Sequence, residues 1–288
     1  MRIVSLACSN TEILAALGCA HLLVGVDDHS DHPPSDLEGL PRVGPDLEID
    51  MEQVVALEPD LVLASLTVPG HETVVEGVEA AGLPHLTLAP TSLPDVYRNV
   101  ETIARRLEEG GVAGVRDRAR RLVEEMRREL GDLESSEESE GTGESPEQGE
   151  LTPRGPSLLI QWWPKPVIAP CGQSWVDPLI HRAGGRNPLS SERRPSRPLE
   201  DEEVAAMAPD AIILSWCGVD PAKYRPDVVY RNPAFQHTPA IRNRNVFCVP
   251  EAYLGRPGPR LIEGIRALRE VVRSVEAGGG VAALGSKG

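Results

Sequence analysis

One stretch of the chain occurs twice, and this repeat constrains the fold more than any other feature. Residues 52–65 (EQVVALEPDLVLAS) match residues 202–215 (EEVAAMAPDAIILS) at a constant offset, with six of fourteen positions identical. Each copy predicts a helix, a Pro-Asp turn and a buried strand. Because the offset spans a whole domain, the repeat favours two lobes of like design over a solenoid. A chance recurrence of a common α/β joint remains the alternative.

Apolar runs alternate with helical patterns on both sides of this repeat. The predicted strands lie at 2–6, 22–26, 61–65, 84–88, 157–161, 211–215 and 246–250. Ser9 and Glu12 form a capping-box pattern, which predicts a helix that begins there. Strands that alternate with helices indicate parallel sheets, so we expect an α/β protein with two Rossmann-like lobes. Residues 112–131 carry apolar side chains at helical spacing and predict a single long helix that joins the lobes.

The predicted organisation has five parts. They are an N-terminal lobe (1–111), the connecting helix (112–131), an acidic insert (132–156), a C-terminal lobe (157–276) and a flexible tail (277–288). The insert carries eight acidic residues and no basic ones between 132 and 150, so we expect it to be disordered. A solubilising insertion explains it better than a binding tail.

Composition excludes several classes of function. The net charge of −15 argues against a nucleic-acid partner, because phosphate binding needs clustered Lys and Arg. Five scattered cysteines do not make a disulfide framework, and no apolar run is long enough for a membrane span. No Walker loop, Gly-x-Ser-x-Gly elbow or dinucleotide motif is present, so we expect no enzyme activity. No signal peptide is recognised, which leaves the compartment open between cytoplasmic and extracytoplasmic.

The aromatic residues indicate a ligand site. In open parallel sheets, ligands bind beyond the carboxyl ends of the strands, and those ends include Ser65 and Ser215. If the lobes face one another, the loops after these strands line one cleft. Aromatics are only 3% of the chain, yet several cluster just after predicted strands. The aromatic wall that we predict comprises Trp162, Trp163, Trp175, Trp216 and Tyr253. Core packing is the alternative role for each of them.

Three histidines extend this site. His29 and His32 follow the second strand, and His71 lies in the loop after the third. They could bind a metal ion, form hydrogen bonds or contact a ligand, including ligation of a metal that the ligand carries. We expect no metal site of the protein's own.

Three segments resemble the periplasmic cobalamin-binding proteins of vitamin ABC importers. These are residues 2–13 (RIVSLACSNTEI), 24–34 (VGVDDHSDHPP) and 58–64 (EPDLVLA). The wider group is the helical-backbone (class III) substrate-binding proteins, which also carry iron–siderophores and haem. The resemblance implies two lobes that close only modestly around a corrinoid ligand, with no cofactor of the protein's own.

The resemblance also assigns residues. The family's Tyr-containing motif before Pro-Pro carries His29 and His32 here, and its Trp after the third strand falls on Ser65. Its aromatic in the second lobe falls on Trp162 or Trp163, and its later Trp-Phe pair on residues 252–254. Family members dock on the ABC permease through two glutamates. Glu72 matches the first, and the second falls on Gly255, where Glu251 could substitute.

The sequence therefore predicts a monomeric, corrinoid-binding component of an ABC import system. We expect one of the histidines at 29 and 32 to approach the cobalt face. The alternatives are a haem or siderophore carrier, which would use Arg193, Arg194 and Arg197, an intracellular corrinoid carrier or sensor, and a metal-dependent enzyme. The enzyme would need His29, His32 and His71 to converge on zinc.

Overall fold

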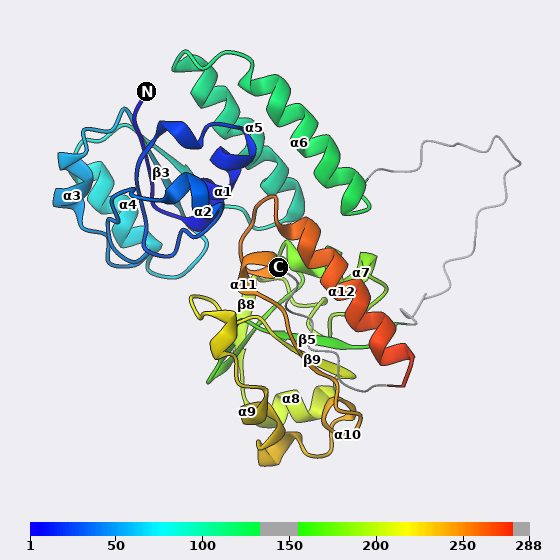
Figure 1. The fold of residues 1–288 in the computed structure, drawn as a ribbon. Coiled ribbons are helices and arrows are strands. Elements are labelled where there is room, and N and C mark those ends of the chain that lie inside the picture. The colour runs from blue at the N-terminus through cyan, green and yellow to red at the C-terminus, as the bar shows by residue number, and fades with distance from the viewer. Residues whose placement is uncertain (133–154, 279–288) are drawn as a thin grey trace, which may run out of the picture. The chain divides into compact units, whose positions relative to one another are not determined.

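The computed structural model describes residues 1–132 and 155–278, which form two compact units (Figure 1). Unit 1 comprises Met1–Glu125 and Arg256–Arg260, and unit 2 comprises Met126–Gly255 and Leu261–Gly288. The chain passes from unit 1 to unit 2 within helix α6 (Val115–Glu129). It then returns to unit 1 for five residues, Arg256–Arg260, which the sequence patterns did not predict.

Unit 1 is an α/β unit built on one parallel sheet with strand order β2-β1-β3-β4. Its strands are β1 (Ile3–Ser5), β2 (Leu23–Val26), β3 (Leu61–Ser65) and β4 (His85–Leu88). Its helices, besides the first part of α6, are α1 (Cys8–Ala16), α2 (Pro34–Leu37), α3 (Met51–Ala56), α4 (His71–Ala80) and α5 (Leu93–Glu109). Every residue of β3 is buried, as expected for a strand inside a parallel sheet.

Unit 2 holds a parallel sheet and a second, antiparallel sheet. The parallel sheet has the order β10-β9-β5, from β5 (Leu158–Gln161), β9 (Ala211–Leu214) and β10 (Val246–Cys248). The antiparallel sheet comprises β6 (Trp163–Pro164), β7 (Val167–Pro170) and β8 (Ser196–Leu199). The helices are α7 (Val176–Arg182), α8 (Asp201–Met207), α9 (Pro226–Tyr230), α10 (Pro239–Arg242), α11 (Glu251–Leu254) and α12 (Leu261–Glu276).

The α/β prediction is confirmed, and all seven predicted strands are present with ends within two residues. The antiparallel sheet was missed, because its strands are short and carry Pro164, Pro170 and Pro198, which do not resemble a buried strand. The ligand cleft expected between the lobes stays a prediction. Nearly all of the predicted acidic insert, and most of the predicted tail, lie outside the described residues.

The capping-box prediction at the first helix is wrong. Helix α1 begins at Cys8, and its N-cap residue Ala7 makes no side-chain hydrogen bond. The Glu12 side chain does not reach back to the helix start, because it pairs with arginines from residues 256–260 instead. A contact across more than 240 residues therefore overrides the local pattern.

The repeat appears in the structure as one joint built twice. Glu58 and Ala208, at equivalent positions, both adopt a left-handed backbone with φ of 48° and 45°. Asp60 then accepts a hydrogen bond from the Arg2 backbone N–H at 2.6 Å, and Asp210 accepts one from Ser157 at 2.8 Å. Each aspartate thus joins the start of its strand to the neighbouring strand.

Candidate functional site

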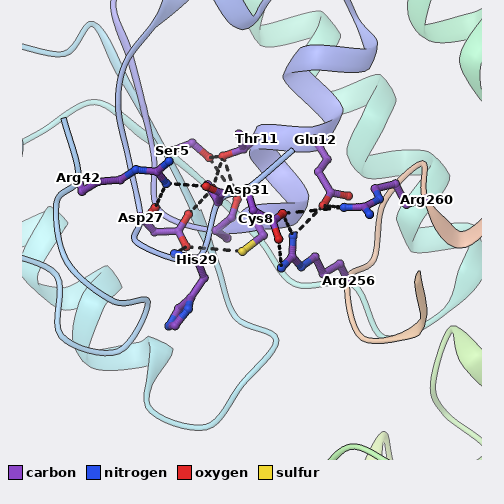
Figure 2. Close-up of polar contacts among 12 residues, drawn as sticks. Ser5, Cys8, Thr11, Glu12, Asp27, His29, Asp31, Arg42, Arg256 and Arg260 are labelled. Atoms are coloured by element: carbon purple, nitrogen blue, oxygen red, sulfur yellow. Dashed lines mark hydrogen bonds and ion pairs between the residues drawn. The ribbon is translucent and has the colours of Figure 1, made fainter. Parts of the chain in front are cut away.

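A buried aspartate organises the loop at the carboxyl end of β2 in unit 1 (Figure 2). Asp27 is fully buried and accepts hydrogen bonds from the Ser30 hydroxyl and, at 3.1 Å, from the His29 backbone N–H. The Cys8 thiol approaches the same carboxylate, with Sγ 3.6 Å from Oδ2. Burial raises the pKa of Asp27, while these hydrogen bonds act in the opposite direction. The carboxylate fixes the backbone of the loop that carries His29.

Three further side chains tie this loop to the sheet. Thr11 Oγ1 on α1 lies 2.9 Å from Ser5 Oγ and 2.8 Å from Ser30 Oγ. The Arg42 guanidinium donates to the backbone carbonyls of Asp27, at 3.0 Å, and of Ser30. Since satisfied buried polar networks specify one conformation, residues 27–30 form a rigid loop rather than a mobile one.

Four charged side chains meet on the other side of the same loop (Figure 2). Glu12 Oε1 accepts hydrogen bonds from Arg256, at 2.9 Å, and from Arg260, at 3.3 Å. Arg256 also binds both carboxylate oxygens of Asp31, at 2.6 and 3.3 Å. Burial raises the pKa of Glu12 to about 7, although the two arginines lower it. This cluster, Glu12–Asp31–Arg256–Arg260, holds the returning segment on unit 1.

Two of the predicted histidines share one carboxylate. His71 is buried at the start of α4, and its Nε2 lies 3.4 Å from Asp46 Oδ2. His29 is 39% exposed, and its Nε2 lies 3.7 Å from Asp46 Oδ1. The hydrogen bond from His71 lowers the pKa of Asp46, so this carboxyl group is ionised at neutral pH. The structure therefore brings His29 and His71 together through Asp46, which the sequence patterns missed.

His32 is exposed and precedes Pro33 through a cis peptide bond. Within residues 1–132 and 155–278, no group of three or more His, Cys, Asp or Glu side chains is placed to hold a metal ion.

The four tryptophans of unit 2 differ in exposure: one is exposed, one is half-buried and two are buried. Trp163 is 42% exposed and Trp162 is half-buried, directly after β5. Trp175 is buried and stacks on Trp162, with ring centroids 5.7 Å apart and planes at 29°. Its indole N–H donates to the Leu254 carbonyl at 2.9 Å, which fixes the ring. Trp162, Trp163 and Trp175 thus make an aromatic platform with a rigid support.

Trp216 lies in the hydrophobic core rather than on a surface. It is 5% exposed and packs at 5.5 Å between centroids on Tyr224, within the core cluster of unit 2. The Tyr224 hydroxyl donates to the Trp216 carbonyl at 3.2 Å. Trp216 and Trp175 therefore have packing roles in this structure, and a direct ligand contact by either stays a prediction. Tyr253 is half-buried on α11.

The remaining predicted residues also have defined positions. Ser65 is buried at the end of β3, with its hydroxyl 3.2 Å from Thr67 Oγ1. Glu72 is exposed and accepts the Gly70 N–H at 2.8 Å, and such backbone N–H groups lower its pKa. Glu251 is half-buried at the first position of α11.

Sequence reasoning missed the charged residues that fix the site. Asp27 and Asp46 belong to no recognisable sequence motif. The run of Asp and His at 27–32 is the one local signal that could have indicated a site there. Arg256 could not be paired with Glu12 from sequence, because nothing local indicates that residues 256–260 return to unit 1.

The comparisons with known proteins agree with this architecture. A family model for periplasmic binding protein matches residues 3–253. A substrate-binding lipoprotein of an ABC transporter, YvrC of Bacillus subtilis, is 28% identical over 94% of this chain and 79% of its own length. The vitamin B12-binding protein of Vibrio parahaemolyticus is 24% identical over 96% of this chain and 90% of its own.

A solved structure is also similar. The periplasmic heme-binding protein RhuT from Roseiflexus sp. RS-1 superposes with a TM-score of 0.74 and 26% identity, covering 95% of this chain and 98% of that one. In the described part of this chain, no helix has the length and apolar character needed to cross a membrane. The match over residues 3–253 is decisive for classification: this chain belongs to the periplasmic binding protein family.

Proposed function

We propose that this substrate-binding protein carries a corrinoid such as cobalamin as part of an ABC import system. Its family membership accounts for substrate binding, and the relatives with comparable chain length include a vitamin B12-binding protein and an ABC lipoprotein. The choice of a corrinoid as the ligand is based on the side chains that follow the strands.

The aromatic platform after β5 is the observation that carries this proposal. Trp163 and Trp162 present indole surface next to solvent, and Trp175 holds Trp162 in place from behind. Large, rigid aromatic surface binds flat or bulky apolar ligands at low cost in side-chain entropy. A corrin ring offers such a surface.

Buried polar atoms beside the platform suit a ligand with polar edges. Among the described residues, Gln161 Oε1, Trp162 Nε1 and Ser215 Oγ are buried without a hydrogen-bond partner. Buried polar groups in native proteins are satisfied in the great majority of cases, and we propose that polar groups of the ligand satisfy these three atoms. The peripheral amides of a corrinoid supply both a donor and an acceptor.

Haem is the second candidate, because the similar solved structure is named as a heme-binding protein. A haem carrier needs cations for two propionates, and two of the three arginines expected in that role, Arg194 and Arg197, pair with glutamates. Arg197 pairs with Glu192 and Glu203, and Arg194 lies 3.6 Å from Glu192. Because these arginines are paired, a ligand with uncharged amide groups, such as a corrinoid, suits the site better than one with carboxylates.

Delivery to a permease would use acidic side chains of both units. Glu72, exposed at the start of α4, is the candidate in unit 1, and Glu251, half-buried at the start of α11, is the candidate in unit 2. The monomeric state, the compartment and the alternative of an intracellular corrinoid carrier or sensor stay predictions.

Calorimetric titration with cyanocobalamin, cobinamide, haem and a ferric siderophore tests the ligand class. We expect the two corrinoids to bind at least ten-fold more tightly than haem or the siderophore. Tighter binding of haem would replace the corrinoid with the second candidate, and failure of all four to bind would refute the proposed ligand chemistry.

A further inference from the structure

His29 is presented by a loop whose backbone is fixed. The Asp27 carboxylate accepts the His29 N–H, and Arg42 holds the carbonyls on either side of it. Figure 2 shows the His29 ring directed away from this network, out of the cluster of charged side chains. The ring is 39% exposed, so a network of buried hydrogen bonds fixes a loop whose histidine side chain is accessible to solvent.

The protons of the second histidine can be assigned from its contacts. His71 Nδ1 accepts the backbone N–H groups of Thr67 and Val68, both at 3.3 Å. An imidazole nitrogen that accepts two N–H groups carries a lone pair, so the ring proton is on Nε2. That proton faces Asp46 Oδ2 at 3.4 Å, and His71 thereby holds the carboxylate in place.

The second oxygen of the same carboxylate faces His29. Asp46 Oδ1 lies 3.7 Å from His29 Nε2, so a proton on Nε2 is favoured electrostatically and a lone pair is left on Nδ1. Histidines that ligate a metal commonly direct their other ring nitrogen at a carboxylate, which orients the ring and raises its basicity. The three residues His71, Asp46 and His29 have this histidine–carboxylate arrangement.

We propose that His29 contacts the metal-bearing face of the ligand through Nδ1, and that Asp46 and His71 are the residues that position its ring. This inference rests on the proposed function, since it needs a ligand that carries a metal. It selects His29, because the His29 ring faces Asp46 and the Asp27 carboxylate holds the His29 backbone N–H.

Visible absorption spectra test the contact directly. Aquocobalamin exchanges its axial water for imidazole, whereas cyanocobalamin keeps its cyanide. We expect the wild-type chain to shift the spectrum of aquocobalamin and leave that of cyanocobalamin unchanged. His29→Ala should abolish the shift while calorimetry still detects binding, and His32→Ala, at the other histidine expected near the metal, should keep it.

The positioning residues need a separate readout. In the protein without ligand, nitrogen NMR of the imidazoles should show His29 mainly as the Nε2–H tautomer, and Asp46→Asn should reduce that preference. Asp46→Asn should also weaken the aquocobalamin shift, and Asp46→Glu should restore part of it.

Two results would overturn the inference. One is an unchanged spectral shift in His29→Ala, and the other is an unchanged His29 tautomer in Asp46→Asn. If neither cobalamin binds the wild-type chain, the proposed function and the metal contact both fail, while the tautomer measurement still decides whether Asp46 orients His29.

Discussion

Units 1 and 2 share one joint and differ at the opposite ends of their strands. Where the strand begins, Asp60 and Asp210 make the same hydrogen bond to a neighbouring strand at 2.6 and 2.8 Å. Where the strand ends, unit 1 carries a charged network around Asp27 and Glu12, and unit 2 carries tryptophans. The scaffold is thus repeated, whereas the side chains beyond the carboxyl ends of the strands differ, and our proposed ligand site uses those side chains.

The substitution Arg256→Ala should give the largest difference in local stability between the two units. Arg256→Ala leaves the buried Glu12 with Arg260 alone, and removing one partner of a buried ion pair typically costs about 3–5 kcal/mol. We expect faster hydrogen exchange in α1 of unit 1, with little change in β9 of unit 2.

Arg266→Ala is the matched control, because the Arg266–Glu129 pair is solvent-exposed and surface ion pairs contribute little to stability. Equal effects of the two substitutions on exchange in α1 would contradict the importance of the Glu12 cluster.

A second prediction concerns pH. The folded chain raises the pKa of Glu12 from 4.5 to about 7, so it binds the proton more tightly than the unfolded chain. The stability that this proton provides is full below about pH 4.5 and is lost as the pH rises through about 7, with a change on the order of 3 kcal/mol. Glu12→Gln should flatten the dependence in this window, measured by urea denaturation at pH 5 and pH 8. A slope identical to wild type would show that Glu12 does not titrate there.

The repeated joint gives the smallest predicted effect. Asp210→Ala should lower the free energy of unfolding by about 1–2 kcal/mol, because the Ser157 N–H loses its charged acceptor. Asp60→Ala should cost less, since the Asp60 side chain is 58% exposed and water can replace it. Thermal denaturation of both variants tests this order, and a larger loss for Asp60→Ala would contradict the role of solvent exposure in it.

The sequence predicts what is local and periodic. The repeat at 52–65 and 202–215 predicted one parallel sheet in each unit, because helix, Pro-Asp turn and strand are specified by neighbouring residues. The sequence did not predict the Glu12–Arg256 contact or the Asp46 carboxylate shared by two histidines, since both depend on segments brought together only by folding.

The aromatic predictions show a second limit of sequence reasoning. Position after a strand predicted the same cleft-lining role for Trp162, Trp163 and Trp216, yet Trp162 and Trp163 are partly or largely accessible and Trp216 packs in the core. Burial depends on the neighbours of a side chain, and these come from α7, α11 and the core around Tyr224.

The central claim is that the indole surface after β5 holds the ligand. Calorimetric titration of cyanocobalamin into Trp162→Ala/Trp163→Ala tests it most directly, with Val228→Ala as a control for loss of an exposed apolar side chain in unit 2. We expect the double variant to lose about 100-fold in affinity, consistent with ~1–2 kcal/mol for each aromatic contact, and the control to match wild type. Wild-type affinity in the double variant would contradict the account.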